Sequence, residues 1–225
     1  MLNGAALNIE TYGDGPETLV FGHGLLWSGR MFEAQIAVLS RRYRCITIDW
    51  RGQGGSDRLL ADARKAHIED FAAYDRDLDA IIRTVADPIG LPKIAMAHSM
   101  GGNILLRRLH DVPGEFTAAI LCAPMLGINF RGAPGWVVKT LARLLNRKAP
   151  SCDFVWGLGA RDQLTQTFDQ QIVTSDPVRY ARNQALLKAD PDLRLNGPTW
   201  SWLADSCLRA NTRVMPRVFA SFRQA

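Results

Sequence analysis

The chain has 225 residues, of which 47% are apolar and 22% charged, so it is long enough for one domain with a sizeable core and a modest insertion. Its formal charge of +5 is a mild basic excess, compatible with an anionic membrane surface or an anionic substrate. The sequence holds no basic run with interleaved aromatic residues, no stretch approaching about 18 uninterrupted apolar residues, and no signal-peptide pattern at residues 1–10. These features disfavour a nucleic-acid partner, a membrane span and secretion.

Strands and helices alternate along the first third of the chain. Apolar runs bounded by turn residues predict the strands, and apolar residues at helical spacing predict the helices. The predicted elements are strands over residues 5–11, 18–21 and 43–49, helices over residues 31–39 and 68–85, and a polar connection over residues 59–67. Asp75, Asp77 and Asp79 alternate along the second helix, so they cannot share one face and no metal site is predicted there.

A glycine-rich turn with the sequence DWRGQGGS follows the third strand, at residues 49–56. It resembles the D-x-R-G-x-G-x-S loop that is common across α/β hydrolases, where it is a structural signature. Asp49 and Arg51 are therefore predicted to be structural. A phosphate-binding role is disfavoured because no Lys-Ser/Thr pair follows, as it would in a P-loop.

A serine between a strand and a helix is the strongest signal in the sequence. An apolar run over residues 93–98 predicts a buried strand, Ser99 follows it, and a helical pattern begins after Gly101 and Gly102. This order is typical of the nucleophile elbow of the α/β-hydrolase fold, with Ser99 as the nucleophile and the N–H of Met100 as one oxyanion donor. Ala97 stands where the usual G-x-S-x-G pattern has its first glycine, so only one methyl group has to fit. An ordinary turn with an incidental serine is the alternative.

The second oxyanion donor is predicted from the end of the second strand. In hydrolases of this fold a His-Gly pair closes that strand, and the next residue supplies the N–H. Here the pair is His23-Gly24, so the donor is Leu25. His23 is predicted to be a structural hydrogen-bonding residue rather than a catalyst. The other predicted supporting residues are Gly24, His98 and Gly101, the last because a Cβ there would collide with the strand.

The rhythm of the chain changes after a further predicted buried strand over residues 117–123. Up to that point the alternation predicts a parallel, doubly wound α/β sheet. From residue 125 to 208 no convincing strand follows, whereas helical patterns, Pro/Gly breaks and four tryptophans do, which predicts a helical cap inserted over the serine. The predicted division is a hydrolase core over 1–124, a cap over 125–208 and the start of a C-terminal core over 209–225.

One predicted cap helix, over residues 136–148, is basic and amphipathic. Lys139, Arg143 and Arg147 repeat every four residues, and valines and leucines occupy most of the remaining positions. Such a helix can lie on a membrane surface or a lipid headgroup. An ordinary cap helix with one solvated face explains the pattern equally well.

Taken together, these stretches resemble bacterial lysophospholipases of the monoglyceride-lipase-like serine hydrolases, a branch in which alanine is also usual at the position of Ala97. Residues 22–39 look more like general α/β hydrolases. The stretches that carry the resemblance are residues 51–60, 97–102, 123–127, 174–177 and 196–203.

The resemblance implies a serine carboxylester hydrolase without cofactor or metal. Ser99 would attack the ester carbonyl, the N–H groups of Met100 and Leu25 would stabilise the oxyanion, and water would release a fatty acid from the acyl-enzyme. The implied partner is a small-molecule lipid ester, either a lysophospholipid or a monoacylglycerol. The predicted location is the cytoplasm, with peripheral contact at the inner face of the membrane; this prediction rests on the cysteines and on the basic helix over residues 136–148, not on the resemblance.

The sequence departs from that family after Ser99. The triad order is Ser, acid, His, and the acid should follow a strand that residues 215–222 resemble. His110 is the only histidine beyond Ser99, and it lies about 15 Å away along the elbow helix at about 1.5 Å per residue. We therefore expect the triad acid and histidine to be absent and the chain to be a truncated hydrolase.

Two other functions are alternatives. The first is a non-catalytic remnant that binds acyl chains or a partner protein under its cap. The second is an aspartate-nucleophile dehalogenase or epoxide hydrolase, which is disfavoured because the elbow carries Ser99.

The four cysteines show no metal-like spacing, and Cys45 and Cys122 fall in predicted buried strands. A reduced cytoplasmic protein is the simplest account.

Overall fold

The structure of the chain is a computed structural model that describes residues 1–130, 133–147, 150–157, 162–171 and 173–209. Its centre is a five-stranded sheet in the order β1-β3-β2-β5-β6. β1 pairs antiparallel with β3, whereas the other neighbouring strands are parallel. The strands are β1 (Ile9–Tyr12), β2 (Thr18–Gly22), β3 (Arg44–Ile48), β5 (Lys93–His98) and β6 (Ala118–Cys122).

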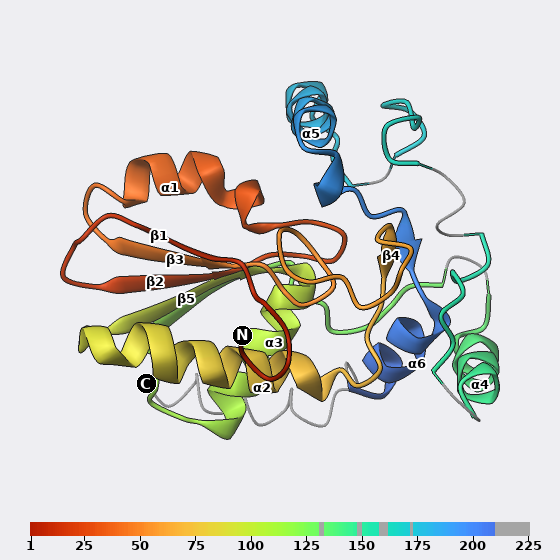
Figure 1. Cartoon of the computed structure of the whole chain (residues 1–225), viewed down its shortest axis with the longest axis horizontal. Helices are drawn as coiled ribbons and strands as arrows, with labels where there is room; N and C mark the ends of the chain where they lie inside the picture. The colour runs from red at the N-terminus through yellow and green to blue at the C-terminus, as the bar shows by residue number, and fades with distance from the viewer. Residues whose placement is uncertain (131–132, 148–149, 158–161, 172, 210–225) are drawn as a thin grey trace.

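Helices cover both faces of this sheet (Figure 1). α1 (Glu33–Leu39) packs on one face, where Phe21 and Ile36 join one apolar cluster. α2 (Ala72–Ile81) and α3 (Ser99–Asp111) lie on the opposite face, in the main core. Side chains of β2 point alternately to the two faces, and because both faces are covered, every residue of β2 is buried. The doubly wound sheet is thus confirmed. Short turns flank these helices: η1 (Gly29–Phe32), the π-helical η2 (Ile82–Ala86) and η3 (Asp87–Ile89).

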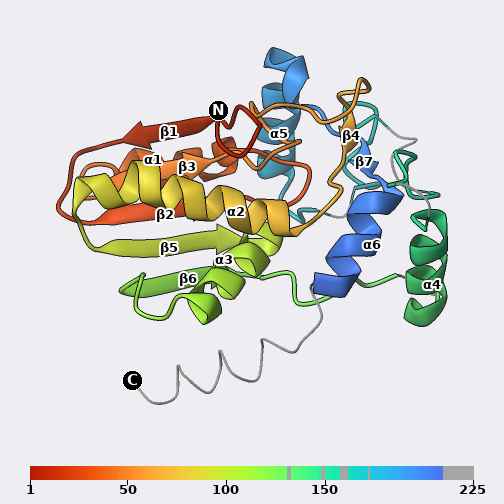
Figure 2. The same cartoon turned by 60° about the horizontal axis from the view of Figure 1, so that its bottom comes forward.

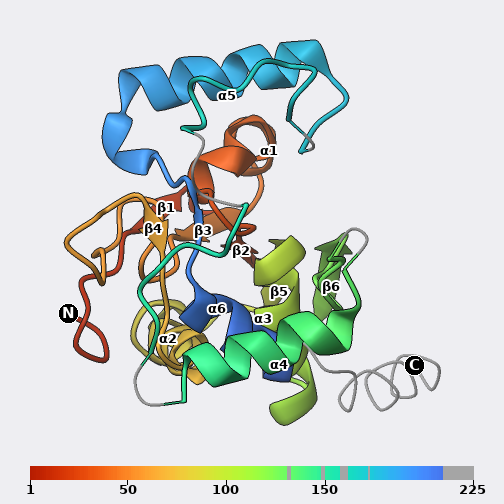
Figure 3. The same ribbon diagram turned by 90° about the vertical axis from the view of Figure 1, so that its right-hand side faces the viewer.

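The segment after β6 gathers beyond the carboxyl ends of the strands and beside α1. α4 and α6 lie past the end of the sheet in Figure 1, and α5 runs across the side of α1 in Figure 3. The elements are α4 (Gly135–Leu145), α5 (Pro177–Ala189), η4 (Pro191–Leu193), β7 (Gly197–Pro198) and α6 (Trp200–Arg209).

α6 is packed into the main core rather than onto a separate one. Trp202 belongs to the same apolar cluster as the sheet residues, with its ring centroid 6.3 Å from that of Phe71. The Ser201 hydroxyl donates to the Ile68 carbonyl over 2.7 Å. The predicted core and cap therefore share one hydrophobic core, although the proposed domain boundaries themselves stay a prediction.

The structure corrects the prediction that the strand at residues 117–123 is buried. β6 is bordered by β5 alone in the described part of the chain, at the edge of the sheet in Figure 2. Ile120 is consequently 53% exposed, and Cys122 is exposed rather than buried. The apolar composition of the run predicted a strand correctly, but it does not say whether a neighbour covers it. Cys45, in contrast, is buried as predicted.

Two further differences concern a pair of short strands and the length of one helix. A two-residue strand β4 (Lys65–Ala66) lies in the predicted polar connection and pairs in parallel with β7, in the region predicted to lack strands. Elements of two residues are too short to show periodicity. The predicted helix over 68–85 is shorter than expected, because α2 begins at Ala72 and the backbone turns π-helical at Ile82 before Pro88. The predicted strand over residues 215–222 lies outside the described residues.

Candidate active site

Ser99 lies where β5 passes directly into α3. Its φ of 49° is in the left-handed region, which is uncommon and strained for a residue with a side chain. The preceding His98 is fully extended, with φ −123° and ψ 139°. The chain therefore changes from strand to helix at a single residue, which is the strained geometry that a nucleophile elbow requires.

Close backbone contacts hold this elbow. The N–H of Gly101 donates to the carbonyl of His23 over 3.0 Å, and the N–H of Met125 donates to the carbonyl of Ser99 over 2.8 Å. A Cβ on Gly101 would lie 2.4 Å from the carbonyl oxygen of Gly22, so only glycine fits there. The predicted role of Gly101 agrees with this contact. Met100 lies in the first turn of α3, where N–H groups have no intrahelical partner.

The loop after β2 packs directly on the elbow. Gly22 of β2 is in register with Ala97 of β5, so the residues that follow these two strands are neighbours. A Cβ on Gly24 would lie 2.8 Å from Nδ1 of His98 and 3.3 Å from Cβ of Ser99. The methyl group of Ala97 is buried in the core, so alanine is accommodated at this position.

The hydrogen bonds of His23 show that this side chain is structural. The ring is buried, its Nδ1 lies 2.7 Å from the carbonyl of Gly24, and its Nε2 accepts from the N–H of Trp50 over 3.1 Å. A carbonyl can only accept, so the proton is on Nδ1. Burial lowers the pKa of His23. With both ring nitrogens engaged, His23 is not placed to accept a proton from Ser99.

The other histidines are engaged elsewhere or partly buried. Nδ1 of His67 lies 2.9 Å from the Thr199 hydroxyl, and Nδ1 of His110 lies 2.8 Å from Asp111 at the far end of α3. Burial lowers the pKa of His98, which is only partly exposed. In the part of the chain that the structure describes, no hydrogen bond joins a histidine ring to the Ser99 hydroxyl.

Comparison with known proteins decides the family. The family model described as "Serine aminopeptidase, S33" (Hydrolase_4) matches residues 16–218. The chain belongs to this S33 hydrolase family. It is 34% identical to "Lysophospholipase L2" of Escherichia coli (strain K12) over 164 residues, which is 72% of this chain and 48% of that protein. It is 28% identical to "Monoacylglycerol lipase" of Mycolicibacterium smegmatis over 145 residues, which is 64% of this chain and 44% of that protein. The chain thus spans about half the length of the curated relatives it matches.

Solved structures confirm the fold that the S33 family implies. A soluble variant of monoglyceride lipase from Saccharomyces cerevisiae superposes with a TM-score of 0.68 at 20% identity, over 93% of this chain and 66% of that one. The monoacylglycerol lipase of Paleococcus ferrophilus gives a TM-score of 0.67 at 19% identity, over 95% of this chain and 72% of that one. The predicted α/β-hydrolase fold is therefore correct.

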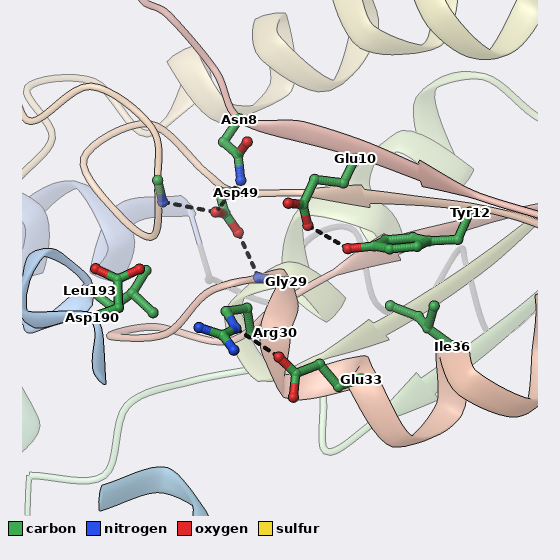
Figure 4. Close-up of a pocket in the computed structure, with 11 residues that line it drawn as sticks. Asn8, Glu10, Tyr12, Gly29, Arg30, Glu33, Ile36, Asp49, Asp190 and Leu193 are labelled. Atoms are coloured by element: carbon green, nitrogen blue, oxygen red, sulfur yellow. Dashed lines mark hydrogen bonds and ion pairs between the residues drawn. The ribbon is translucent and has the colours of Figure 1, made fainter. Parts of the chain in front are cut away.

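The glycine-rich turn, residues 49–56, contacts the candidate site more closely than the sequence suggested. Asp49 accepts from the N–H of Gly29 over 2.5 Å, and its carboxylate lies between Asn8 and Gly29 in Figure 4. Gln53 accepts from the N–H of Leu26 over 2.8 Å. Sequence reasoning missed Gln53, because the signature assigned the turn a structural role without saying what it supports.

A polar cavity of about 400 Å³ is lined by Asp49 and Gly29, among other residues (Figure 4). Its lining includes Glu10, Glu33, Asp190 and Arg30 but not Ser99. Among the described residues, no group of three or more His, Cys, Asp or Glu side chains could hold a metal ion. None of the helices in the described ranges combines the length and apolar character that crossing a bilayer requires.

Proposed function

We propose that the chain is the Ser99-bearing part of a serine carboxylester hydrolase that acts on lysophospholipids or monoacylglycerols. The observation that carries the proposal is the left-handed backbone of Ser99 at the β5–α3 junction, with Gly24 packed against it. Membership of the S33 family supports a hydrolase. The names of the relatives from Escherichia coli and Mycolicibacterium smegmatis support a lipid ester as the substrate class.

In the proposed reaction, Ser99 Oγ forms a bond to the ester carbonyl carbon as its proton passes to a base. The N–H groups of Leu25 and Met100 stabilise the oxyanion, and each such donor lowers the barrier by about 2.7–4 kcal/mol. The bond to the alcohol then breaks, and the alcohol leaves with a proton. Water attacks the acyl-enzyme, which releases a fatty acid and restores Ser99.

Catalysis requires a base that accepts the proton of Ser99, and the presence of this base decides between two candidate functions. None of the four histidines of the sequence is hydrogen-bonded to Ser99 in the described part of the chain. A non-catalytic module that binds acyl chains or a protein under its cap is therefore the second candidate function.

Labelling with a fluorophosphonate probe separates the two candidates. The purified 225-residue chain is incubated with the probe beside the Ser99→Ala variant. Labelling that disappears in Ser99→Ala supports a hydrolase with an activated serine. An unlabelled wild-type chain of native fold overturns catalysis by this chain and favours the binding module. Thermal unfolding of both proteins checks that the fold is intact.

We also propose peripheral contact with the inner face of an anionic membrane, and hence a cytoplasmic location. α4 supports the contact, because Trp136 is 73% and Leu144 60% exposed on a helix that also exposes Arg143 and, just beyond its end, Arg147. All four cysteines are free, which agrees with a reducing compartment.

A further inference from the structure

The glycine-rich turn holds the loop that carries the proposed second oxyanion donor. This loop, residues 23–29, is bound to the turn through three separate residues. Trp50 donates from its backbone N–H to Nε2 of His23 and from its indole to the carbonyl of His23, over 3.1 and 3.0 Å. Asp49 and Gln53 accept from the backbone N–H groups of Gly29 and Leu26, over 2.5 and 2.8 Å. Hydrogen bonds from the turn therefore fix the conformation of the loop.

Among these three residues of the turn, Gln53 contacts both segments that carry a proposed oxyanion donor. The side chain is fully buried. Its oxygen must face Leu26, because a backbone N–H can only donate, and its amide nitrogen then faces Sδ of Met100 at 3.6 Å. One side chain thus joins the segment that carries Leu25 to the segment that carries Met100.

The loop needs such a support because its backbone is strained. Leu26 has a φ of 62°, and this left-handed conformation is unfavourable for a residue with a side chain. The hydrogen bond from its N–H to Gln53 fixes the peptide between Leu25 and Leu26. The loss of this acceptor would leave a strained residue with a partly buried donor that has no partner.

The peptide before Leu25 is fixed from the other side. Nδ1 of His23 donates to the carbonyl of Gly24. A trans peptide is planar, and its N–H points opposite to its C=O. The N–H of Leu25 is therefore directed away from the His23 ring. Both peptides that flank Leu25 are held by buried side chains, His23 on one side and Gln53 on the other.

We infer that Gln53 is a positioning residue for the oxyanion hole, acting through the backbone of Leu25 and Leu26. The inference rests on the proposed function for its catalytic meaning. Its structural content, the restraint of the Leu26 N–H by Gln53, is independent of catalysis and can be measured separately.

Amide hydrogen exchange of the 225-residue chain tests that restraint. Gln53→Met keeps the length of the side chain and removes the acceptor, whereas Gln53→Glu keeps an acceptor for Leu26. Gln35→Met makes the same chemical change on α1, away from the loop, and serves as the matched control. We expect exchange at Leu26 to accelerate by about tenfold or more in Gln53→Met, because the partly buried hydrogen bond that its N–H donates is lost. Gln53→Glu should restore protection, and Val20 in the centre of the sheet should stay protected throughout.

Three results would overturn the inference: unchanged exchange at Leu26 in Gln53→Met, an equal acceleration at Val20, or the same change in Gln35→Met. If Gln53→Met does not fold, the exchange at Leu26 in Gln53→Glu is the deciding measurement. Loss of protection at Leu26 in that variant contradicts the role of the acceptor. The rate of Ser99 labelling by the fluorophosphonate gives the catalytic readout, with an expected decrease of about tenfold or more in Gln53→Met. An unlabelled wild-type chain contradicts the proposed function, whereas the exchange at Leu26 still reports on Gln53.

Discussion

The backbone N–H of Gly101 donates to the carbonyl oxygen of His23 over 3.0 Å, which ties the first turn of α3 to the loop after β2. The two backbones are so close that a Cβ on Gly101 would lie 2.4 Å from the oxygen of Gly22 and 2.6 Å from that of His23. Both neighbours are main-chain atoms next to the buried strand β2, so neither can move aside cheaply.

Gly101→Ala is therefore expected to destabilise the fold. Overpacking of this kind costs about 1–3 kcal/mol, and urea unfolding followed by circular dichroism measures it. Gly127→Ala is the matched control, because a Cβ there meets nothing within 4 Å and should change the free energy of unfolding by less than about 0.5 kcal/mol. Equal stability of Gly101→Ala and the wild type would show that the elbow relaxes more easily than its contacts imply.

Arg51→Met is expected to cost about 3–5 kcal/mol of stability, because it leaves the carboxylate of Asp77 buried without its cation. Nε and Nη2 of Arg51 both contact this carboxylate, at 2.5 Å each, and Asp77 is fully buried. The double variant Arg51→Met/Asp77→Leu should recover much of the loss, since it removes both charges. Arg64→Met breaks the exposed pair with Asp62 and should reduce the stability far less, because solvent screens the two charges. Similar losses in Arg51→Met and Arg64→Met would contradict this ranking.

The sequence was most informative where one residue type is dictated by geometry. The pattern around Ser99 predicted the strand, the turn and the helix, because a sharp elbow needs glycine at position 101. The role of Gln53 was not visible, because its partners Leu26 and Met100 are 27 and 47 residues away in the chain. The exposure of β6 was missed for a related reason: the sequence of an apolar strand does not show whether a neighbouring element covers it.

Stability is expected to fall as the pH decreases below about 6.5. Burial lowers the pKa of His23, His67 and His98 below their ordinary value, so these rings stay neutral in the folded chain while the unfolded chain binds protons. Their contribution is fully present above the unfolded pKa and is lost as the pH falls toward the folded values. Each ring contributes a slope of at most about 1.4 kcal/mol per pH unit.

Urea unfolding at several pH values between about 5.5 and 7.5 measures this slope, within the window set by the unfolded histidine. His67→Gln should reduce the slope, whatever it does to the absolute stability, because it removes one of the three depressed groups. A free energy of unfolding that is flat or that rises as the pH decreases would show that the buried rings take up protons in the folded state.

Vesicle binding is expected to depend on the exposed face of α4. Trp136→Ser removes a large apolar side chain that is 73% exposed, and it should weaken cosedimentation with vesicles of phosphatidylglycerol and phosphatidylcholine in equal parts. Arg143→Gln should weaken binding to these vesicles by about fivefold, or about 1 kcal/mol, and should leave binding to pure phosphatidylcholine unchanged. Val38→Ser removes an exposed apolar side chain from α1 and is the matched control. If Val38→Ser weakens binding as much as Trp136→Ser does, the contact is not specific to α4, and the helix is an ordinary cap element with a solvated face.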